Sequence, residues 1–336
     1  VFCMEKNHTL PPVPEAFHQR VQHTLEGLPE QTRSQRRFPL RGVAGVALAA
    51  ALCLGGTAVA AGVSGGFPLF FPQGEDAALS DYIAAPAGVV TDENDHYRMT
   101  VDAFLFDEAT GTGLVRLHIE NKAGDGVRPF EVLEYYPQYQ NQPGLAWSGL
   151  EQVWGNGDGK LAFQVMYGEN HTGSRFYLDT TRSTENDYYL EGAFIAGPAS
   201  GIDTAQAPLR LVARDYALDR TGLGGEVLSA DLPQAQAMPS CQGGTDGVGV
   251  TLSAVGLQIT NQNQTYGYVV DDLHTIALRL ADGTEQVMVD DANAIDQTLY
   301  ALGTEDRKTV TYALAQTFAL DQVTAVVLNG TAYPLH

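Results

Sequence analysis

Residues 98–122 read RMTVDAFLFD-EATGT-GLVRLHIENK, two mostly apolar runs separated by a short loop. Side chains alternate between the two faces of a strand, so each run offers one apolar face. These faces consist of Met99, Val101 and Ala103 in the first run, and of Val115, Leu117 and Ile119 in the second. The loop at residues 108–112 contains Gly111 and suits a hairpin connection. The stretch therefore predicts two antiparallel strands.

The sequence downstream repeats this pattern almost to its end. Asp282-Gly283 lies between IALRL and EQVMV, and Asn329-Gly330 lies between AVVL and AYPL. Dipeptides of this kind between apolar runs are strong hairpin signals. Many short strands separated by turn residues predict a mainly β protein with two antiparallel β-sandwich-like (Ig-like) domains, at residues 96–219 and 248–336. A helix between Asp290 and Leu302 is a less well supported element.

Residues 220–247 interrupt the strand pattern. They are rich in Gly and Pro and contain few large apolar residues. Such composition is typical of a connection between domains. We interpret the segment as a linker between the two domains that could include a short edge strand.

Upstream of the β region lies a different kind of segment, Gly42 to Val63, which reads GVAGVALAAALCLGGTAVAAGV. It has no charge and no proline, and as a helix it would be about 33 Å long, enough to cross a membrane. Arg33, Arg36, Arg37 and Arg41 precede it, and no Lys or Arg follows before Arg98. Positive charge marks the cytoplasmic side of a membrane segment. The sequence predicts a single-pass protein of the cell membrane with its N-terminus in the cytoplasm and residues beyond the helix outside.

The apolar segment has a second interpretation. Ala58-Val59-Ala60 resembles the cleavage site of a signal peptide. Signal peptides, however, have a short charged region and an apolar core of about 7–15 residues, whereas a long tail precedes the apolar run here. We expect a retained transmembrane helix at residues 42–63, between a cytoplasmic tail at 1–41 and a Gly- and Pro-punctuated stalk at 64–95.

The cytoplasmic tail contains one candidate for a partner surface. A helix starting near Pro14 would align Phe17, Val21 and Leu25 on one face, since they are four residues apart. A short amphipathic helix is marginal unless something covers its apolar stripe. The membrane surface, a second copy of the chain and a cytoplasmic partner are the three candidates for that cover.

Charge is divided unevenly along the chain. The first 41 residues hold six Lys/Arg and four Glu, a net of +2, whereas the whole chain has a net charge of −21, which leaves −23 for the remainder. Such an acidic region is repelled by nucleic acid, so we expect no nucleic-acid partner. The three cysteines, Cys3, Cys53 and Cys241, fall one in each expected compartment. A disulfide-free exported domain is typical of a bacterial cell surface.

No catalytic motif stands out. The sequence has no H-E-x-x-H motif and no P-loop. We therefore expect no enzymatic activity, no cofactor and no metal site. Tyr135, Tyr136, Trp147 and Trp154 belong to a run rich in aromatic residues. Exposed aromatic faces bind ligands with little loss of entropy, so these four residues are candidates for a surface that binds cell-wall carbohydrate or another extracellular ligand. Their alternative role is as ordinary strand residues.

The C-terminal run LDQVTAVVLNGTAYPL, Leu320 to Leu335, resembles the closing hairpin of an uncharacterised ectodomain family of single-pass bacterial membrane proteins, many of them anti-sigma-factor-like. The apolar pattern at 250–259 is similar, as is the layout of Pro14–His18 followed by a basic run and an Ala-rich anchor. The resemblance implies a membrane-anchored sensing or interaction protein with a sigma factor or other cytoplasmic regulator as partner. The alternative is a structural or adhesive cell-surface protein that binds the cell wall and does not signal.

Overall fold

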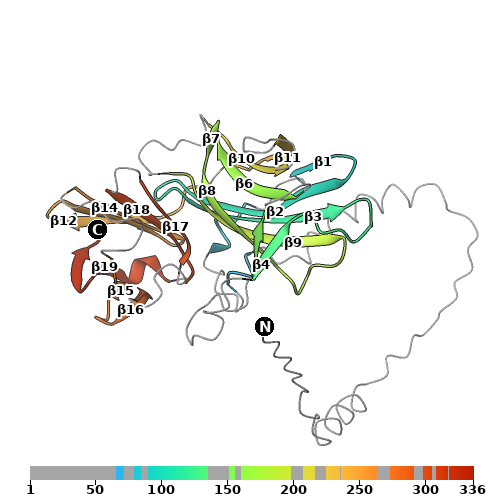
Figure 1. Ribbon diagram of the computed structural model, residues 1–336. Helices are drawn as coiled ribbons and strands as arrows, with labels where there is room; N and C mark the ends of the chain where they lie inside the picture. Colours follow the sequence, from blue (N-terminus) through green and yellow to red (C-terminus); the bar gives the residue numbers. More distant parts are fainter. Residues whose placement is uncertain are drawn as a thin grey trace, which may run out of the picture. The chain divides into compact units, whose positions relative to one another are not determined.

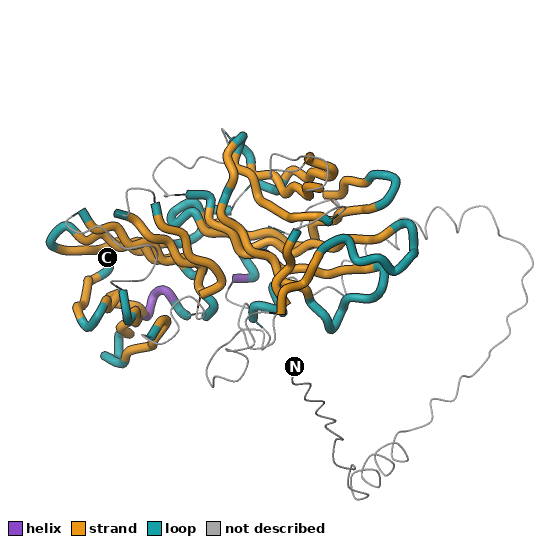
Figure 2. The backbone as a smooth tube through the Cα atoms, viewed as in Figure 1, coloured by secondary structure: helices purple, strands orange, loops and turns teal. Residues whose placement is uncertain are grey.

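The described part of the chain is mainly β. The computed structural model describes residues 66–71, 79–84, 90–134, 151–155, 160–197, 207–215, 225–234, 236–262, 273–290, 298–304, 308–316 and 318–336. Within them, four sheets are formed and every pair of neighbouring strands is antiparallel (Figures 1 and 2). The predicted fold class is confirmed at this level.

The first two sheets are formed by the strands before residue 232. Sheet A has seven strands in the order β1 (Val90–Glu93), β2 (Tyr97–Asp107), β3 (Thr112–Asn121), β9 (Asp187–Ile195), β8 (Gly173–Leu178), β5 (Glu151–Trp154) and β4 (Glu131–Glu134). Sheet B has four strands in the order β11 (Gly225–Asp231), β10 (Leu209–Asp215), β6 (Leu161–Tyr167) and β7 (Asn170–His171). The hairpin expected at residues 98–122 is confirmed as β2 and β3.

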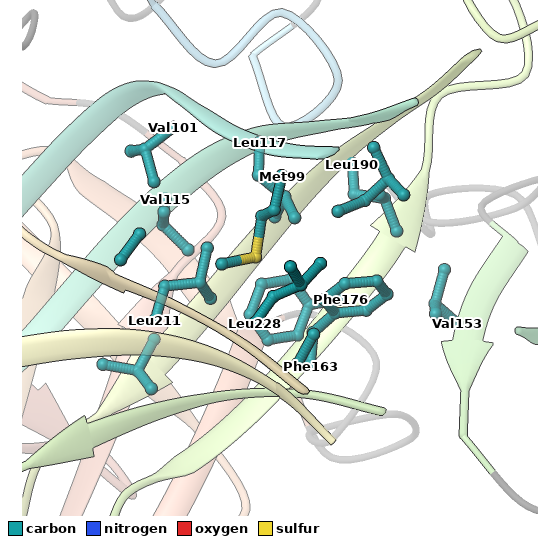
Figure 3. Packing of buried hydrophobic residues seen from close by; sticks show 14 of the residues in the cluster. Met99, Val101, Val115, Leu117, Val153, Phe163, Phe176, Leu190, Leu211 and Leu228 are labelled. Atoms are coloured by element: carbon teal, nitrogen blue, oxygen red, sulfur yellow. The ribbon is translucent and has the colours of Figure 1, made fainter. Parts of the chain in front are cut away.

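An apolar core combines side chains from these two sheets. The labelled residues of Figure 3, among them Met99 of β2, Phe176 of β8 and Leu211 of β10, converge on it. Phe104 and Phe106 of β2 stack on Phe194 of β9 with ring centroids 6.3 and 5.6 Å apart. Burying such side chains contributes about 1.5–3 kcal/mol each, so this core holds the two sheets together.

One detail of the predicted hairpin is wrong. Met99 and Val101 face the core between sheets A and B, but Ala103 lies in a different cluster and Phe104 takes its place. The cause is an irregularity of register, because Val101 pairs with Leu117 and Ala103 with Arg116, which leaves Asp102 as an extra residue. A β-bulge of this kind reverses the alternation beyond it.

The remaining strands form a second pair of sheets. Sheet C has the order β12 (Ser240–Thr245), β13 (Val248–Ser253), β14 (Gly256–Asn261), β18 (Thr309–Leu314) and β17 (Thr298–Gly303). Sheet D has the order β16 (Glu285–Val289), β15 (Ile276–Leu280), β19 (Val323–Leu328) and β20 (Thr331–Pro334), and the short 3-10 helix η2 (Leu320–Gln322) precedes β19. Both predicted hairpins, at Asp282-Gly283 and Asn329-Gly330, are confirmed. At the second turn both residues have positive φ, 47° and 81°, as a type I′ turn requires.

Two other expectations need revision. The predicted linker at 220–247 contains the strands β11 and β12, and β11 contributes the buried Leu228 and Ala230 to the core of sheets A and B. In place of the suggested helix between Asp290 and Leu302, the described residues 298–303 form β17. β12 has few apolar residues and is specified by its pairing with β13, which a local reading of the sequence does not reveal.

The segment expected to be a stalk packs closely wherever it is described. Phe67, Phe71 and Leu79 are almost completely buried. They belong to a third apolar cluster that covers the second face of sheet A and also includes Val255 and Leu299 from the sheet C region. Sheet A is therefore apolar on both faces in this area, as buried sheets are.

Among the described residues, no helix is long and apolar enough to cross a membrane. The segment 42–63 and the cytoplasmic tail lie outside the described residues.

Candidate functional site

A cleft of about 310 Å³ opens where strands of sheets A and B meet a strand of sheet C. Strands β5, β6, β8 and β10 contribute to its lining, and Tyr300 reaches it from β17. Its lining residues are Gln152, Val153, Trp154, Gly155, Ala162, Phe163, Gln164, Thr172, Gly173, Ser174, Arg175, Phe176, Arg214 and Tyr300.

Trp154 is the large aromatic side chain exposed in this cleft. Along β5, Val153 enters the core, so the next residue points away from it and Trp154 remains 46% exposed. The following residue, Gly155, lies against β6, and a Cβ placed there would come within 2.4 Å of the backbone of Ala162. Close approach of two backbones at this point requires glycine. Trp154 thus projects from a tightly packed strand end.

Arg175 and Tyr300 lie together in the cleft lining. The Arg175 guanidinium lies over the Tyr300 ring, with its carbon 5.5 Å from the ring centroid. Gly173 makes room for this ring, because a Cβ at that position would come within 2.6 Å of the Tyr300 hydroxyl. Burial raises the pKa of Tyr300 and the nearby Arg175 charge opposes the shift, so the hydroxyl stays neutral and can donate or accept a hydrogen bond.

Two arginines line the cleft of this acidic chain. Arg175 and Arg214 line it, and none of its described lining residues is acidic, although the chain as a whole has 40 Asp and Glu against 19 Lys and Arg. Arg214 places Nη2 3.9 Å from the Met166 sulfur, and Gln164 Oε1 accepts a hydrogen bond from His171 Nδ1 at 2.9 Å. The cleft is suited to an anionic ligand with hydrogen-bonding groups.

A second polar arrangement lies on the face of sheet A that points away from the core shared with sheet B. It is beneath residues 66–71, which we call the covering segment. Glu191 of β9 accepts hydrogen bonds from the backbone N–H groups of Leu69 and Phe70, at 3.1 and 3.0 Å. Its cross-strand neighbour Arg116 of β3 donates to the carbonyl oxygen of Gly66 at 2.5 Å. Two buried ionisable side chains thus hold the backbone of the covering segment.

Burial dominates the electrostatics of this arrangement. It raises the pKa of Glu191 to about 8, against the opposing effects of the two backbone N–H groups and of Arg116. Burial also raises the pKa of Asp102, the extra residue of the bulge, whose carboxylate lies 3.9 Å from Arg116 Nε. A carboxyl group with a pKa near 8 changes its charge within the physiological pH range.

Next to these residues, a row of stacked side chains lies on the same face. The His118 ring stacks on Tyr189 with centroids 4.6 Å apart, and the Arg182 guanidinium lies 4.1 Å from the centroid of the Tyr189 ring. His118 Nε2 is 3.1 Å from Asp187. No group of three or more metal-ligating side chains is found in the described residues.

The structure tests the sequence-predicted site residues only in part. Trp154 lines the cleft, whereas Tyr135, Tyr136, Trp147 and the tail residues Phe17, Val21 and Leu25 lie outside the described residues. Among the other aromatic residues of the same run, Tyr177 and Tyr188 are buried in apolar clusters, as ordinary strand residues are.

Sequence reasoning missed most of the site. Arg175, Arg214 and Tyr300 come together only through the fold. Arg116 and Glu191 carried a usable signal, since each is a charged residue inside an otherwise apolar run, GLVRLHI and YLEGAFI. A buried charge in such a run is uncommon unless it is paired.

Comparisons with known proteins give no family. No protein-family model matches the chain, and no curated protein matches it. Among solved structures, one match is the crystal structure of the conserved domain protein from Bacillus anthracis, which is 12% identical in sequence. The match covers 74% of this chain and 77% of that chain, with a TM-score of 0.38.

Proposed function

We propose that this chain is a membrane-anchored sensing and interaction protein with an anti-sigma-like layout, in which residues 42–63 span the membrane and the two β regions are extracytoplasmic Ig-like sandwiches. The observation that carries the proposal is the attachment of the covering segment to sheet A through Glu191 and Arg116. Only Ser64 and Gly65 separate the apolar stretch from Gly66. A change in the β region would therefore act directly on the chain that leaves the membrane.

The chemistry of this attachment supports a sensing role over a passive one. Burial of an ionisable side chain is costly and its hydrogen bonds offset only part of that cost, so Glu191 and Arg116 are weak devices for stability alone. A stalk that only held a domain at the surface would need just the apolar contacts of Phe67, Phe70 and Phe71. The added carboxylate and guanidinium make the contact responsive to protons and to movement of strands β3 and β9.

The second candidate function is that of a structural or adhesive surface protein. The cleft favours it, because an exposed tryptophan beside arginines suits attachment to a cell-wall component. This function needs no cytoplasmic partner. The tail residues Phe17, Val21 and Leu25 therefore separate the two candidates.

The test uses the full chain in membranes and measures which cytoplasmic proteins are captured with it. We expect wild type to capture a regulator, and Phe17→Ala with Val21→Ala to abolish that capture while the β regions stay folded. Glu191→Gln, which leaves one of the two backbone N–H groups without its carboxylate acceptor, should change the amount captured. Glu120→Gln is the matched control, because Glu120 is a partly exposed glutamate of β3 paired with Arg98.

Two results would contradict the sensing function. One is recovery of the same cytoplasmic proteins with wild type and with the double variant. The other is recovery of no such protein with wild type. Either would leave the adhesive function as the better account.

A further inference from the structure

We propose that the cleft binds an acidic saccharide, with a carboxylate of the ligand at the arginines and a sugar ring against Trp154. This inference rests on the proposed function in that it names a ligand for the extracytoplasmic region. Its observations are separate, because they concern the cleft lining and not the covering segment.

The aromatic side chains argue for a saccharide. Trp154 presents a large rigid face with little rotamer entropy to lose, and Tyr300 supplies a second ring from a different strand. Both also carry a polar group, the indole N–H and the phenol hydroxyl, that can bond a sugar hydroxyl. The cleft volume of about 310 Å³ lies at the lower end of the range for small-molecule sites.

The neutral polar residues fit the same ligand. Gln152, Gln164 and Ser174 add amide and hydroxyl groups to the lining, and these groups both donate and accept hydrogen bonds. A sugar ring carries hydroxyl groups of the same dual character around its edge. A lining that combines aromatic rings with hydrogen-bond donors and acceptors thus matches a sugar ring, which has two less polar faces and hydroxyl groups around its edge.

The arginines argue for an acidic form of that saccharide. Each guanidinium has five N–H donors in a planar fork and can hold a carboxylate while it keeps contacts within the protein. Arg175 and Arg214 are two of only 19 basic residues in the chain, and none of the described residues lining the cleft is acidic. The rest of the surface repels anions, so an acidic ligand is directed to this cleft.

The experiment measures, by calorimetry, the affinity of the full chain for a uronic-acid hexasaccharide at low and at physiological salt concentration. We expect binding that weakens as salt rises, and at least tenfold weaker binding of the same oligosaccharide after its carboxyl groups are reduced to alcohols. Trp154→Leu, which keeps an apolar side chain and removes the ring face, should weaken binding. Arg175→Gln should weaken it about tenfold or more.

Controls separate this ligand from a general attraction of anions. Arg279→Gln removes the same charge from a surface arginine paired with Glu285 and should leave binding unchanged. A hexaglutamate peptide should bind much less tightly than the saccharide. Equal binding of the reduced oligosaccharide, equal binding of the peptide, equal weakening by Arg279→Gln, or no binding at all would overturn the inference. None of these results depends on a cytoplasmic partner, so they leave the capture experiment as an independent test of the proposed function.

Discussion

Glu191 is a buried ionisable side chain that holds the covering segment. It is 1% exposed and accepts hydrogen bonds from two backbone N–H groups of residues 69 and 70. Burial raises its pKa from the ordinary 4.5 to about 8. The folded protein therefore binds a proton at Glu191 at pH values at which the unfolded chain has released it.

This difference predicts how stability depends on pH. Because the folded state binds more protons, the contribution of Glu191 is fully present below pH 4.5 and is lost as the pH rises through about 8. The free energy of unfolding should fall with pH across this window, with a slope of at most about 1.4 kcal/mol per pH unit from this group. Chemical denaturation of the full chain at several pH values measures it.

Glu191→Gln provides the control, since glutamine does not titrate. The variant should show a flatter profile between pH 5 and 8 than wild type, whereas Glu120→Gln should follow wild type. A wild-type profile that rises with pH in this window and is unchanged by Glu191→Gln would show that Glu191 stays ionised in the fold.

At the scale of elements, β8 connects the cleft with the covering segment. Ser174 and Arg175 line the cleft. Arg175 Nη1 lies 3.5 Å from the Tyr177 hydroxyl, and the Tyr177 ring meets Phe70 edge to face with centroids 5.9 Å apart. Tyr177 is also the cross-strand partner of Glu191. Strand β8 thus contributes residues to both arrangements.

The covering segment should depend on Phe70. This side chain is 4% exposed, and its replacement by alanine leaves a cavity next to Tyr177. Phe70→Ala should destabilise the β region by about 3–5 kcal/mol and speed amide exchange at Leu69 and Phe70. Val127→Ala, at a position 55% exposed, should change stability by less than about 0.5 kcal/mol. Unaltered exchange at residues 69 and 70 in Phe70→Ala would mean that the segment is held by other contacts.

Sequence patterns predicted the hairpins and the mainly β fold because these depend on neighbouring residues. Alternation and turn chemistry defined β2 and β3, and Asn329-Gly330 defined the last turn. Ala103 was placed on the wrong face because a bulge has no local signature here. The burial of Phe67 was not predicted because Val255 and Leu299, which belong to the same apolar cluster, are far away in the sequence. The cleft was predicted only at Trp154, because Arg175, Arg214 and Tyr300 meet through long-range packing.

Across the chain, charge follows the predicted sides of the membrane. The basic residues before Gly42 and the acidic remainder of the chain suit a cytoplasmic tail and an exported region that anionic surfaces repel. The cleft, with its two arginines, belongs to the acidic part of the chain. Every function proposed above for the cleft and for the covering segment requires residues 66–336 to lie outside the cell.

Cysteine labelling in intact bacterial protoplasts tests this claim most directly. Cys3 and Cys241 lie on opposite sides of the apolar stretch, and Cys241 is free and partly exposed. A variant with Cys3→Ser and Cys53→Ser keeps Cys241, and one with Cys53→Ser and Cys241→Ser keeps Cys3. With a membrane-impermeant maleimide, we expect Cys241 to be labelled in intact protoplasts and Cys3 only after permeabilisation. Labelling of Cys3 in intact protoplasts, or of Cys241 only after permeabilisation, would contradict the account.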